Sequence, residues 1–451
     1  MLQATIRRLL TRISISLVIA ALAGGFARAQ TPAPPPSRTV VHAGRLLDVR
    51  SGHWISDQHI YIEGDRISRL EPAGKPAPSG WTLIDLGSAS VLPGLIDCHV
   101  HLTIKPSSFG YEVLGISEAR QTLTGAASAQ KTLLAGFTTV RNVGALGFTD
   151  VALRDAINEG EVAGPRMLVS GIPLSITGGH FDNNLLPWDY HARFAGVADG
   201  VDGVRHMVRE QIKYGADLIK FMASGGVLSK GDDPRASQYS LEEMKMIVSE
   251  AHRLGRKVAV HAHGSQAILW ALEAGADSIE HGSYVDDQGV AAMKARGTYL
   301  VPTLYTDDFL LENLQVLHLP EFLARKAREV LPEATKNVSR ALKRGVKVAF
   351  GTDAGVYPHG LNAREFHSMT KAGLSSLAAI QAATINAADL IGWSDKAGAL
   401  EAGKWADIIA VDGDPLEDVR RLESVKFVMK GGRVFKNEFA KAGGPAEPTD
   451  R

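Results

Sequence analysis

Between residues 93 and 392 the sequence alternates short apolar segments with longer amphipathic ones, and this alternation is the strongest constraint on the fold. Strands that alternate with helices in this way form a parallel sheet. Each helix returns the chain to the end of the sheet where the previous strand began, so the next strand runs in the same direction. Eight such units in about 300 residues match a (β/α)8 TIM barrel. The predicted strands are 94–100, 137–144, 166–171, 216–222, 257–263, 278–282, 299–304 and 347–353.

The helical segments carry recognisable start and stop signals. Ser240 is followed three residues later by Glu243, the spacing of a capping box. Gly255, Gly275 and Gly345 each follow an amphipathic run, where glycine ends a helix. The segments between the strands are therefore predicted to be helices.

The two ends of the chain have a different character. Residues 39–92 and 393–436 read as short strands joined by glycine turns, with a hairpin turn at 63–65. We predict an α/β protein in which a barrel, 93–392, carries one small β-sandwich domain formed by both termini, 39–92 and 393–436.

The first residues read as an export signal. Arg7, Arg8 and Arg12 precede an apolar segment, 13–27, and a small-residue cleavage site ends at Ala29. We predict a signal peptide over 1–29, a linker over 30–38 and a flexible tail over 437–451. The mature protein is expected to be periplasmic or secreted. The pair Arg7-Arg8 keeps twin-arginine export open as an alternative to the general route.

Composition excludes some partners. The formal net charge is zero and no run of lysine and arginine follows the signal peptide, so we expect no nucleic-acid partner. The single cysteine, Cys98, excludes an internal disulfide framework and is interpreted as a core residue. We expect a small-molecule amide or peptide as the partner, no membrane association after signal cleavage, and a homo-oligomer.

Metal-binding side chains occur at the ends of the predicted strands. In TIM barrels function resides where strands end and loops begin. Alternate residues of a strand share a face, so Asp97, His99 and His101 are predicted to point the same way. The candidate metal ligands are His99, His101, Lys220, His261, His281 and Asp353.

Lys220 interrupts the apolar segment 218–222, where an unpaired ammonium would cost several kcal/mol. Two interpretations follow from its chemistry. The amine could react with carbon dioxide and bridge two metal ions as a carbamate anion. Alternatively, it could reach into the barrel mouth as an ammonium and pair with Asp353.

Several motifs together resemble a known family: 92–102 (LPGLIDCHVHL), 215–226 (GADLIKFMASGG), 260–264 (VHAHG), 278–282 (SIEHG), 351–354 (GTDA), 358–366 (PHGLNAREF) and 383–392 (ATINAADLIG). The chain resembles the amidohydrolase superfamily, and within it the peptidase-like group of Xaa-Pro dipeptidases, lysine/arginine carboxypeptidases and ochratoxin-degrading amidohydrolases. The resemblance implies two zinc or other divalent ions bridged by carboxylated Lys220. It places His99, His101 and Asp353 on the more buried ion, and His261 and His281 on the more exposed one.

One position departs from the family pattern. Asn142 stands in the second predicted strand where related sequences generally have aspartate. Asn142 is not an expected ligand, so we interpret the change as an altered hydrogen bond behind the ligands.

The resemblance and the loop positions suggest further roles. Asp353, His281 and His180 are the predicted catalytic residues, with Asp353 moving a proton from the attacking hydroxide to the departing amine. The predicted substrate contacts, suited to a carboxylate, are His180, Arg235, His263, Tyr284 and Tyr305.

We therefore predict a metal-dependent hydrolase in which a metal-bridging hydroxide cleaves the amide bond of N-acyl or aminoacyl amino acids with a free carboxylate, ochratoxin A included. The same site could instead act as a lactonase, esterase or phosphotriesterase. Lys220 argues against a mononuclear deaminase or imidazolonepropionase-like enzyme. The complete ligand set argues against a non-enzymatic binding protein.

Overall fold

Strands from both ends of the chain share one mixed sheet. The computed structural model describes residues 37–106, 108, 110–191 and 194–440, so the predicted signal peptide and most of the predicted tail lie outside the described residues. The strands are β1 (Arg38–Asp48), β2 (His53–Glu63), β3 (Arg66–Pro72), β4 (Thr82–Asp85), β5 (Ser90–Pro93), β13 (Ile408–Val411), β14 (Phe427–Lys430) and β15 (Arg433–Asn437).

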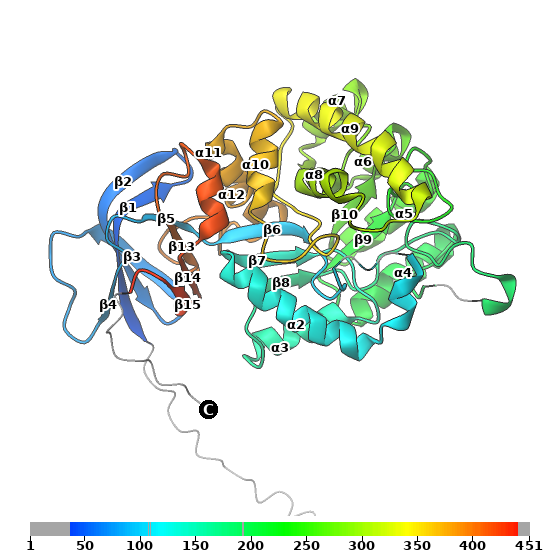
Figure 1. The fold of residues 1–451 in the computed structure, drawn as a ribbon. Helices are drawn as coiled ribbons and strands as arrows, with labels where there is room; N and C mark the ends of the chain where they lie inside the picture. Colours follow the sequence, from blue (N-terminus) through cyan, green and yellow to red (C-terminus); the bar gives the residue numbers. More distant parts are fainter. Residues whose placement is uncertain (1–36, 107, 109, 192–193, 441–451) are drawn as a thin grey trace, which may run out of the picture. The chain divides into compact units, whose positions relative to one another are not determined.

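The order in this sheet is β15-β14-β13-β5-β1-β2-β3, and β4 pairs with β1. Strand β5 lies between β1, which it joins in parallel, and β13, which it joins antiparallel. Figure 1 shows the result as blue N-terminal strands beside red C-terminal ones. The shared origin of the strands is as predicted, whereas two stacked layers of a sandwich stay a prediction.

Two parallel sheets occupy the middle of the chain. One contains β6 (Leu95–Val100), β7 (Phe137–Asn142) and β8 (Arg166–Val169). The other contains β9 (Leu218–Met222), β10 (Lys257–Ala262), β11 (Ser278–His281) and β12 (Tyr299–Val301). These seven strands lie where the sequence predicts them, and nearly all of their residues are buried.

The eighth predicted strand, 347–353, forms only an isolated bridge at Val348. Its backbone nevertheless bonds both sheets. The Ala349 N–H donates to the Leu300 carbonyl of β12 (3.1 Å), and the Phe350 carbonyl accepts a bond from the Cys98 N–H of β6 (2.8 Å). At the other junction between the two sheets, the Leu174 N–H donates to the backbone carbonyl of Lys220 (2.9 Å). The chain is thus α/β with two linked parallel sheets, and their closure into one eight-stranded barrel stays a prediction.

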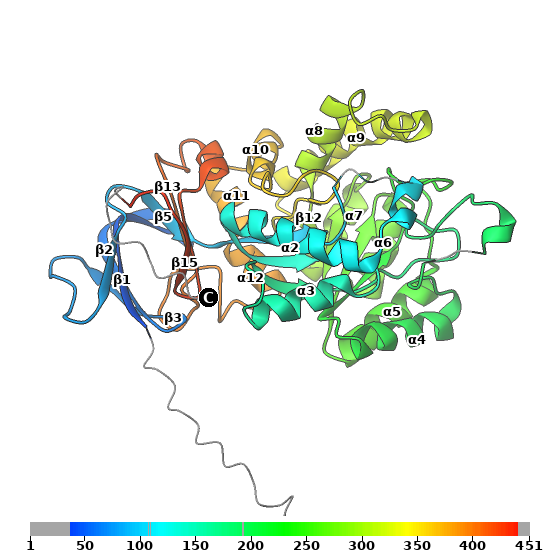
Figure 2. The ribbon, with the colours of Figure 1, turned by 60° about the horizontal axis from the view of Figure 1, so that its bottom comes forward.

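Helices connect and cover these sheets. The α-helices are α2 (Glu118–Leu134), α3 (Thr149–Asn158), α4 (Gly200–Lys213), α5 (Leu241–Arg253), α6 (Ser265–Ala274), α7 (Asp287–Arg296), α8 (Leu304–Asn313), α9 (Glu321–Lys343), α10 (Arg364–Lys371), α11 (Ser376–Ala382) and α12 (Ile385–Leu390). The 3-10 helices are η1 (Gly110–Gly115), η2 (Trp188–Tyr190) and η3 (Val419–Ser424). Figures 1 and 2 show α2 and α3 side by side against β7 and β8.

The helix signals act as predicted. Ser240 and Glu243 form a complete capping box at the start of α5. Gly255, Gly275 and Gly345 all have positive φ, the left-handed conformation that ends a helix. Cys98 is fully buried and packs among apolar side chains.

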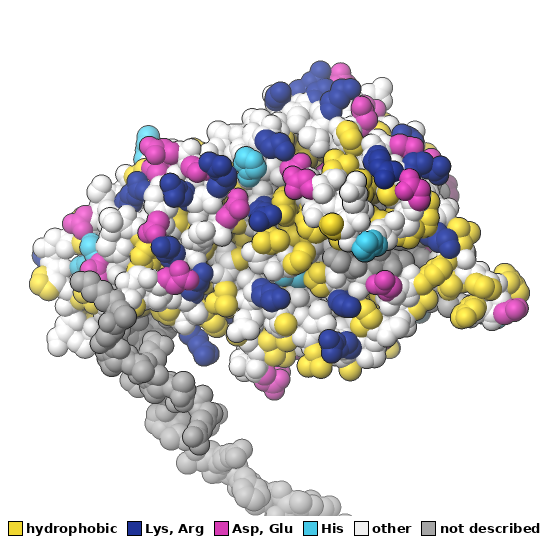
Figure 3. Space-filling model, viewed as in Figure 1, with side chains coloured by type: hydrophobic (Ala, Val, Ile, Leu, Met, Phe, Trp, Pro, Cys, Tyr) yellow, Lys and Arg dark blue, Asp and Glu magenta, His cyan; other side chains and the backbone are white. Residues whose placement is uncertain are grey.

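The surface of the described residues is mixed in charge. Figure 3 shows lysine and arginine side chains interspersed with aspartate and glutamate over the face in view. The described part of the chain contains no helix long and apolar enough to cross a membrane.

Candidate functional site

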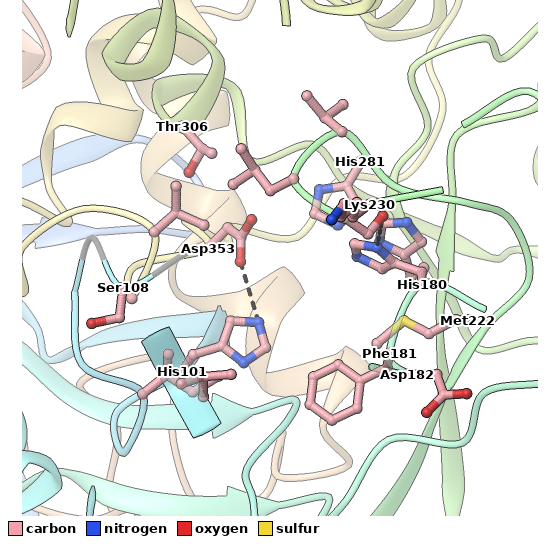
Figure 4. A pocket seen from close by; sticks show the side chains of 18 of the residues that line it. His101, Ser108, His180, Phe181, Asp182, Met222, Lys230, His281, Thr306 and Asp353 are labelled. Atoms are coloured by element: carbon pink, nitrogen blue, oxygen red, sulfur yellow. Dashed lines mark hydrogen bonds and ion pairs between the residues drawn. The ribbon is translucent and has the colours of Figure 1, made fainter. Parts of the chain in front are cut away.

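One cavity collects all six predicted metal ligands. His99, Lys220, His261 and His281 lie on β6, β9, β10 and β11, His101 directly follows β6, and Asp353 lies at the end of segment 347–353. All six side chains line this cavity, as do His180 and His263. Figure 4 shows Asp353 with His101 on one side and His281 and His180 on the other. Parallel strands that end at one edge bring together residues far apart in the sequence.

Asp353 lies at the centre of the cluster. Its Oδ1 is 3.2 Å from His101 Nε2 and 3.4 Å from His99 Nε2. Ligand atoms of His99, His281 and Asp353 lie within 4.8 Å of one another. Imidazole nitrogens and a carboxylate oxygen are the ligands that zinc prefers, so these residues fit a divalent ion.

Each predicted histidine ligand has one ring nitrogen bonded to a group outside the predicted ligand set, as is typical of metal-binding histidines. The bonds are His99 Nδ1 to Glu280 Oε2 (2.7 Å), His101 Nδ1 to the Gly144 carbonyl (3.1 Å), His281 Nδ1 to Thr303 Oγ1 (2.8 Å) and His261 Nε2 to the Gly225 carbonyl (3.2 Å). Such partners fix the orientation of the rings.

The protonation states suit metal binding. Burial lowers the pKa values of His261 and His281 well below the usual range, so both rings are neutral at neutral pH. Burial opposes ionisation of Asp353, but hydrogen bonds from His101 and His99 outweigh it and hold the pKa well below its usual value. Neutral imidazoles and an ionised carboxylate are the forms that bind metal ions.

Lys220 is only 1% exposed. Burial lowers the pKa of its amine to about 8, although Glu280 and Asp353 act in the opposite direction. Among the described residues, no hydrogen bond or ion pair holds this amine, and the alternative pairing with Asp353 is not found. Lys220 therefore presents a buried amine, bonded by none of the described residues, beside the predicted metal ligands.

Glu280 is a residue of the site that the sequence analysis did not select. It is fully buried beside the ligand His281, and its carboxylate bonds His99 and Arg141 Nη2 (2.8 Å). Burial disfavours its charge, but Arg141 and His99 outweigh that effect and lower its pKa to about 2. A charged residue within an apolar strand was the available signal, as it was for Lys220.

Asp97 and Asn142 lie behind the ligands. The Asp97 carboxylate does not line the cavity; it accepts bonds from Thr352 Oγ1 (2.7 Å) and Asn362 Nδ2 (2.9 Å), which corrects its predicted direction. Asn142 Nδ2 donates to the Gly144 carbonyl (3.1 Å), the same oxygen that holds His101. Both residues therefore position ligands without touching the cavity.

The predicted substrate contacts divide into two groups. His180 and His263 line the cavity, and the His180 ring stacks on His261 with centroids 4.3 Å apart. Glycine is required at 226, because a Cβ there would lie 2.0 Å from His180 Cε1. His180 Nδ1 bonds Ser229 Oγ at 2.7 Å, which leaves Nε2 for a substrate.

The other three predicted contacts lie outside the described cavity lining. Arg235 is exposed and lies 5.1 Å from the centroid of the Tyr284 ring. Tyr305 is 7% exposed, and its hydroxyl accepts a bond from Arg364 Nη1 at 2.7 Å. Position after a strand end was not sufficient to place these side chains in the cavity.

Comparison with known proteins agrees with this geometry. Residues 90–435 match the Amidohydrolase family. The chain belongs to the amidohydrolase family. This amidohydrolase is 37% identical over 370 residues to the ochratoxinase of Aspergillus niger, a match that covers 77% of this chain and 75% of the ochratoxinase.

Solved structures extend the likeness over the fold. A Xaa-Pro dipeptidase with bound methionine in the active site has a TM-score of 0.85 and 39% identity, over 89% of this chain and 100% of that chain. A prolidase complexed with N-methylphosphonate-L-proline has a TM-score of 0.83 and 32% identity, over 89% and 100% of the two chains. The predicted resemblance to the peptidase-like amidohydrolases is confirmed.

Charged side chains of the amidohydrolase cavity that the sequence analysis missed include Lys230 and Asp307. Lys230, in the loop after β9, and Asp307, in the first half of α8, both line the cavity. Neither stands in an apolar strand, so the sequence offered no contrast that would single them out.

Three of the eight described non-glycine residues with positive φ lie at the amidohydrolase site. The predicted ligands His281 and Asp353 have φ values of 66° and 57°, and Thr303, which holds His281, has a φ of 52°. Residues with side chains seldom adopt this left-handed conformation, and it costs about 1–3 kcal/mol where it occurs. For Asp353 the conformation is held by its N–H, which donates to the His99 carbonyl at 2.7 Å.

Proposed function

We propose that this amidohydrolase uses two divalent metal ions to cleave the amide bond of N-acyl or aminoacyl amino acids that carry a free carboxylate. The observation that carries the proposal is the convergence of four histidines, one carboxylate and a buried lysine amine on one cavity. Six ligands are too many for one four-coordinate zinc with an open position. A closed (β/α)8 barrel with a terminal β-sandwich belongs to the same proposal.

Lys220 is proposed to carry a carbamate. A neutral amine attacks carbon dioxide, an N–C bond forms, one proton is released, and an anion replaces the amine. The lowered pKa of Lys220 favours the neutral amine that this step requires. The anion would balance charge between an ion held by His99, His101 and Asp353 and an ion held by His261 and His281.

Bound divalent ions lower the pKa of water and polarise a substrate carbonyl. Asp353 is proposed to take the proton of the attacking water, because its carboxylate lies in the cavity beside the predicted ligands His99 and His101. The same carboxyl group can then deliver this proton to the departing amine. His281 contributes as a ligand beside Asp353, and His180 Nε2 is free to orient the substrate.

Recognition of the substrate carboxylate is assigned to Lys230 together with His180. Lys230 Nζ lies 3.1 Å from the Tyr111 hydroxyl and 4.7 Å from the centroid of its ring. No carboxylate of the described residues pairs with Lys230, so its charge remains available to a ligand. It is one of the labelled side chains of the cavity in Figure 4.

The test is a panel of dipeptides and N-acyl amino acids, each supplied as the free acid and as the C-terminal amide. Metal-loaded enzyme is expected to hydrolyse free acids with kcat/KM at least about tenfold higher, equivalent to 1.4 kcal/mol. Lys230→Met should reduce this preference, whereas Lys336→Met, on the exposed face of α9, should preserve it. Equal rates on acids and amides would contradict the assignment and favour a lactonase or esterase.

We also propose that the protein is exported after cleavage near Ala29 and that it assembles into a homo-oligomer. N-terminal sequencing of the mature protein and light scattering test them.

A further inference from the structure

Asp307 stands on the cavity wall without a protein partner. It follows Thr306 in α8, and Thr306, Asp307 and Leu310 all line the cavity. The described residues contribute no hydrogen-bond donor and no cation to its carboxylate. A charged group in this position is therefore open to a ligand.

The other carboxylates of the cavity are already engaged. Asp353 belongs to the metal cluster. Asp182 accepts bonds from the N–H groups of Gly178 (3.0 Å), Asn183 (2.8 Å) and Phe194 (3.2 Å). Among the described lining residues, Asp307 is thus the acid whose acceptor atoms have no assigned bond.

In these surroundings the ionised carboxylate of Asp307 is unfavourable unless a cation pairs with it. Burial raises the pKa of the Asp307 carboxyl well above its usual value, and the nearby carboxylates Asp308 and Asp353 act in the same direction. Apolar side chains, Leu310, Leu331 and Val356, line the same cavity. Charged groups in such an environment are generally paired.

We propose that Asp307 binds a positively charged group of the substrate, either the α-ammonium of an aminoacyl residue or a basic side chain. This inference rests on the proposed amide hydrolysis and narrows its substrates to cationic ones. With Lys230 binding the carboxylate and Asp307 the cation, the cavity has an available group of each charge outside the predicted metal ligands, which matches a zwitterionic dipeptide. Uncharged N-acyl amino acids leave Asp307 unpaired and are poorer substrates.

Three substrates with one common leaving amino acid test the inference. The first carries a free α-ammonium and a neutral side chain, the second is its N-acetyl derivative, and the third is N-acetylated but carries a basic side chain. Wild-type enzyme is expected to favour at least one cationic substrate over the uncharged one by about tenfold or more in kcat/KM. The two cationic arms show which group Asp307 binds.

In Asp307→Asn this ratio should fall toward one, mainly through KM. Asp308→Asn is the matched control, because Asp308 bonds Ser368 Oγ at 2.7 Å and lies outside the cavity lining. It should keep the wild-type ratio. Asp307→Glu, which retains the charge, should keep part of the preference and covers the case in which the asparagine variant does not fold.

Two outcomes overturn the inference. One is wild-type enzyme that hydrolyses the uncharged substrate as fast as both cationic ones, and the other is an unchanged ratio in Asp307→Asn. Either result leaves the proposed amide hydrolysis intact. Failure to hydrolyse any of the three amides would instead contradict the proposed function itself.

Discussion

Lys220 is a lysine of unusual surroundings, because its amine is buried at a cluster of histidines and no described residue holds it. Lys220→Ala is expected to lose most of the bound metal and the turnover. A short carboxylic acid should restore part of both by occupying the gap. Metal content per chain, measured by elemental analysis with and without acetate, checks this.

Lys404→Ala is the matched control for this experiment. Lys404 is also buried, but its amine donates to the Ser394 (2.8 Å) and Ala397 (3.2 Å) carbonyls away from the cavity. It should change stability while the metal content per folded chain stays at the wild-type value. Wild-type metal content and turnover in Lys220→Ala would show that Lys220 only fills space.

Asp353→Asn separates proton transfer from backbone geometry. Asparagine tolerates the left-handed conformation that position 353 requires, so the fold should be retained. Turnover should fall by at least about a hundredfold, because an amide cannot accept and return the proton. Circular dichroism and steady-state kinetics check this, and a loss seen only in KM would speak against the proposed role.

At the scale of elements, the start of α8 is held in place by a neighbouring helix. Glu365 on α10 is fully buried, and its carboxylate accepts bonds from the N–H groups of Leu304 (3.0 Å) and Tyr305 (2.6 Å) at the start of α8. The preceding residue, Thr303, holds His281. The start of α8 is therefore bonded both to α10 and to the predicted metal ligand His281.

Glu365→Gln should lower the free energy of unfolding by about 1–3 kcal/mol. The Leu304 and Tyr305 N–H groups each bond one carboxylate oxygen of Glu365, and a glutamine side chain has only one oxygen. Urea unfolding of the metal-free protein measures the change. Glu312→Gln, at an exposed position of α8, should stay within about 0.5 kcal/mol of wild type. Similar values for the two variants would contradict this account of α8.

The elements and the gathering of the predicted ligands in one cavity were predictable for one reason. Apolar strands and amphipathic helices leave strong periodic patterns, and a histidine or lysine that breaks such a pattern is visible in the sequence. The seven strands and the gathering of His99, Lys220 and Asp353 followed from this. Segment 347–353 was predicted as a strand because it is apolar. In the structure its backbone makes single hydrogen bonds to the neighbouring strands and an isolated bridge at Val348.

The rest of the site depends on loops. Arg235, Tyr284 and Tyr305 follow strands just as His180 does, but packing directs them to one another or into the protein. Lys230 and Asp307 reach the cavity from segments whose polar residues are ordinary for a surface. Their directions depend on tertiary packing, which the periodicity of the sequence does not encode.

At the scale of the whole molecule, the proposed ligands come from segments spread between residues 99 and 353, so the intact site exists only in the folded chain. Metal should therefore bind the native state selectively and stabilise it. At a free metal concentration one hundred times Kd, the expected gain is about 2.7 kcal/mol for one site.

Thermal unfolding after dialysis against a chelator, with and without added zinc, measures this gain. The midpoint should rise with zinc in wild type and respond far less in Lys220→Ala. Metal that binds while the midpoint stays fixed would indicate ions held outside the proposed site.

The pairing of β5 with β13 has a consequence for synthesis. Residues 90–93 reach their neighbour only when residues 408–411 have left the ribosome, more than 300 positions later. Until then the nascent chain carries a hydrogen-bonding edge at β5 directly before the strand that bears His99. Open edges recruit other chains. Strands β13, β14 and β15 thus complete the sheet that β1 begins. If synthesis stops before β13, the chain keeps an open edge at β5 and is expected to aggregate.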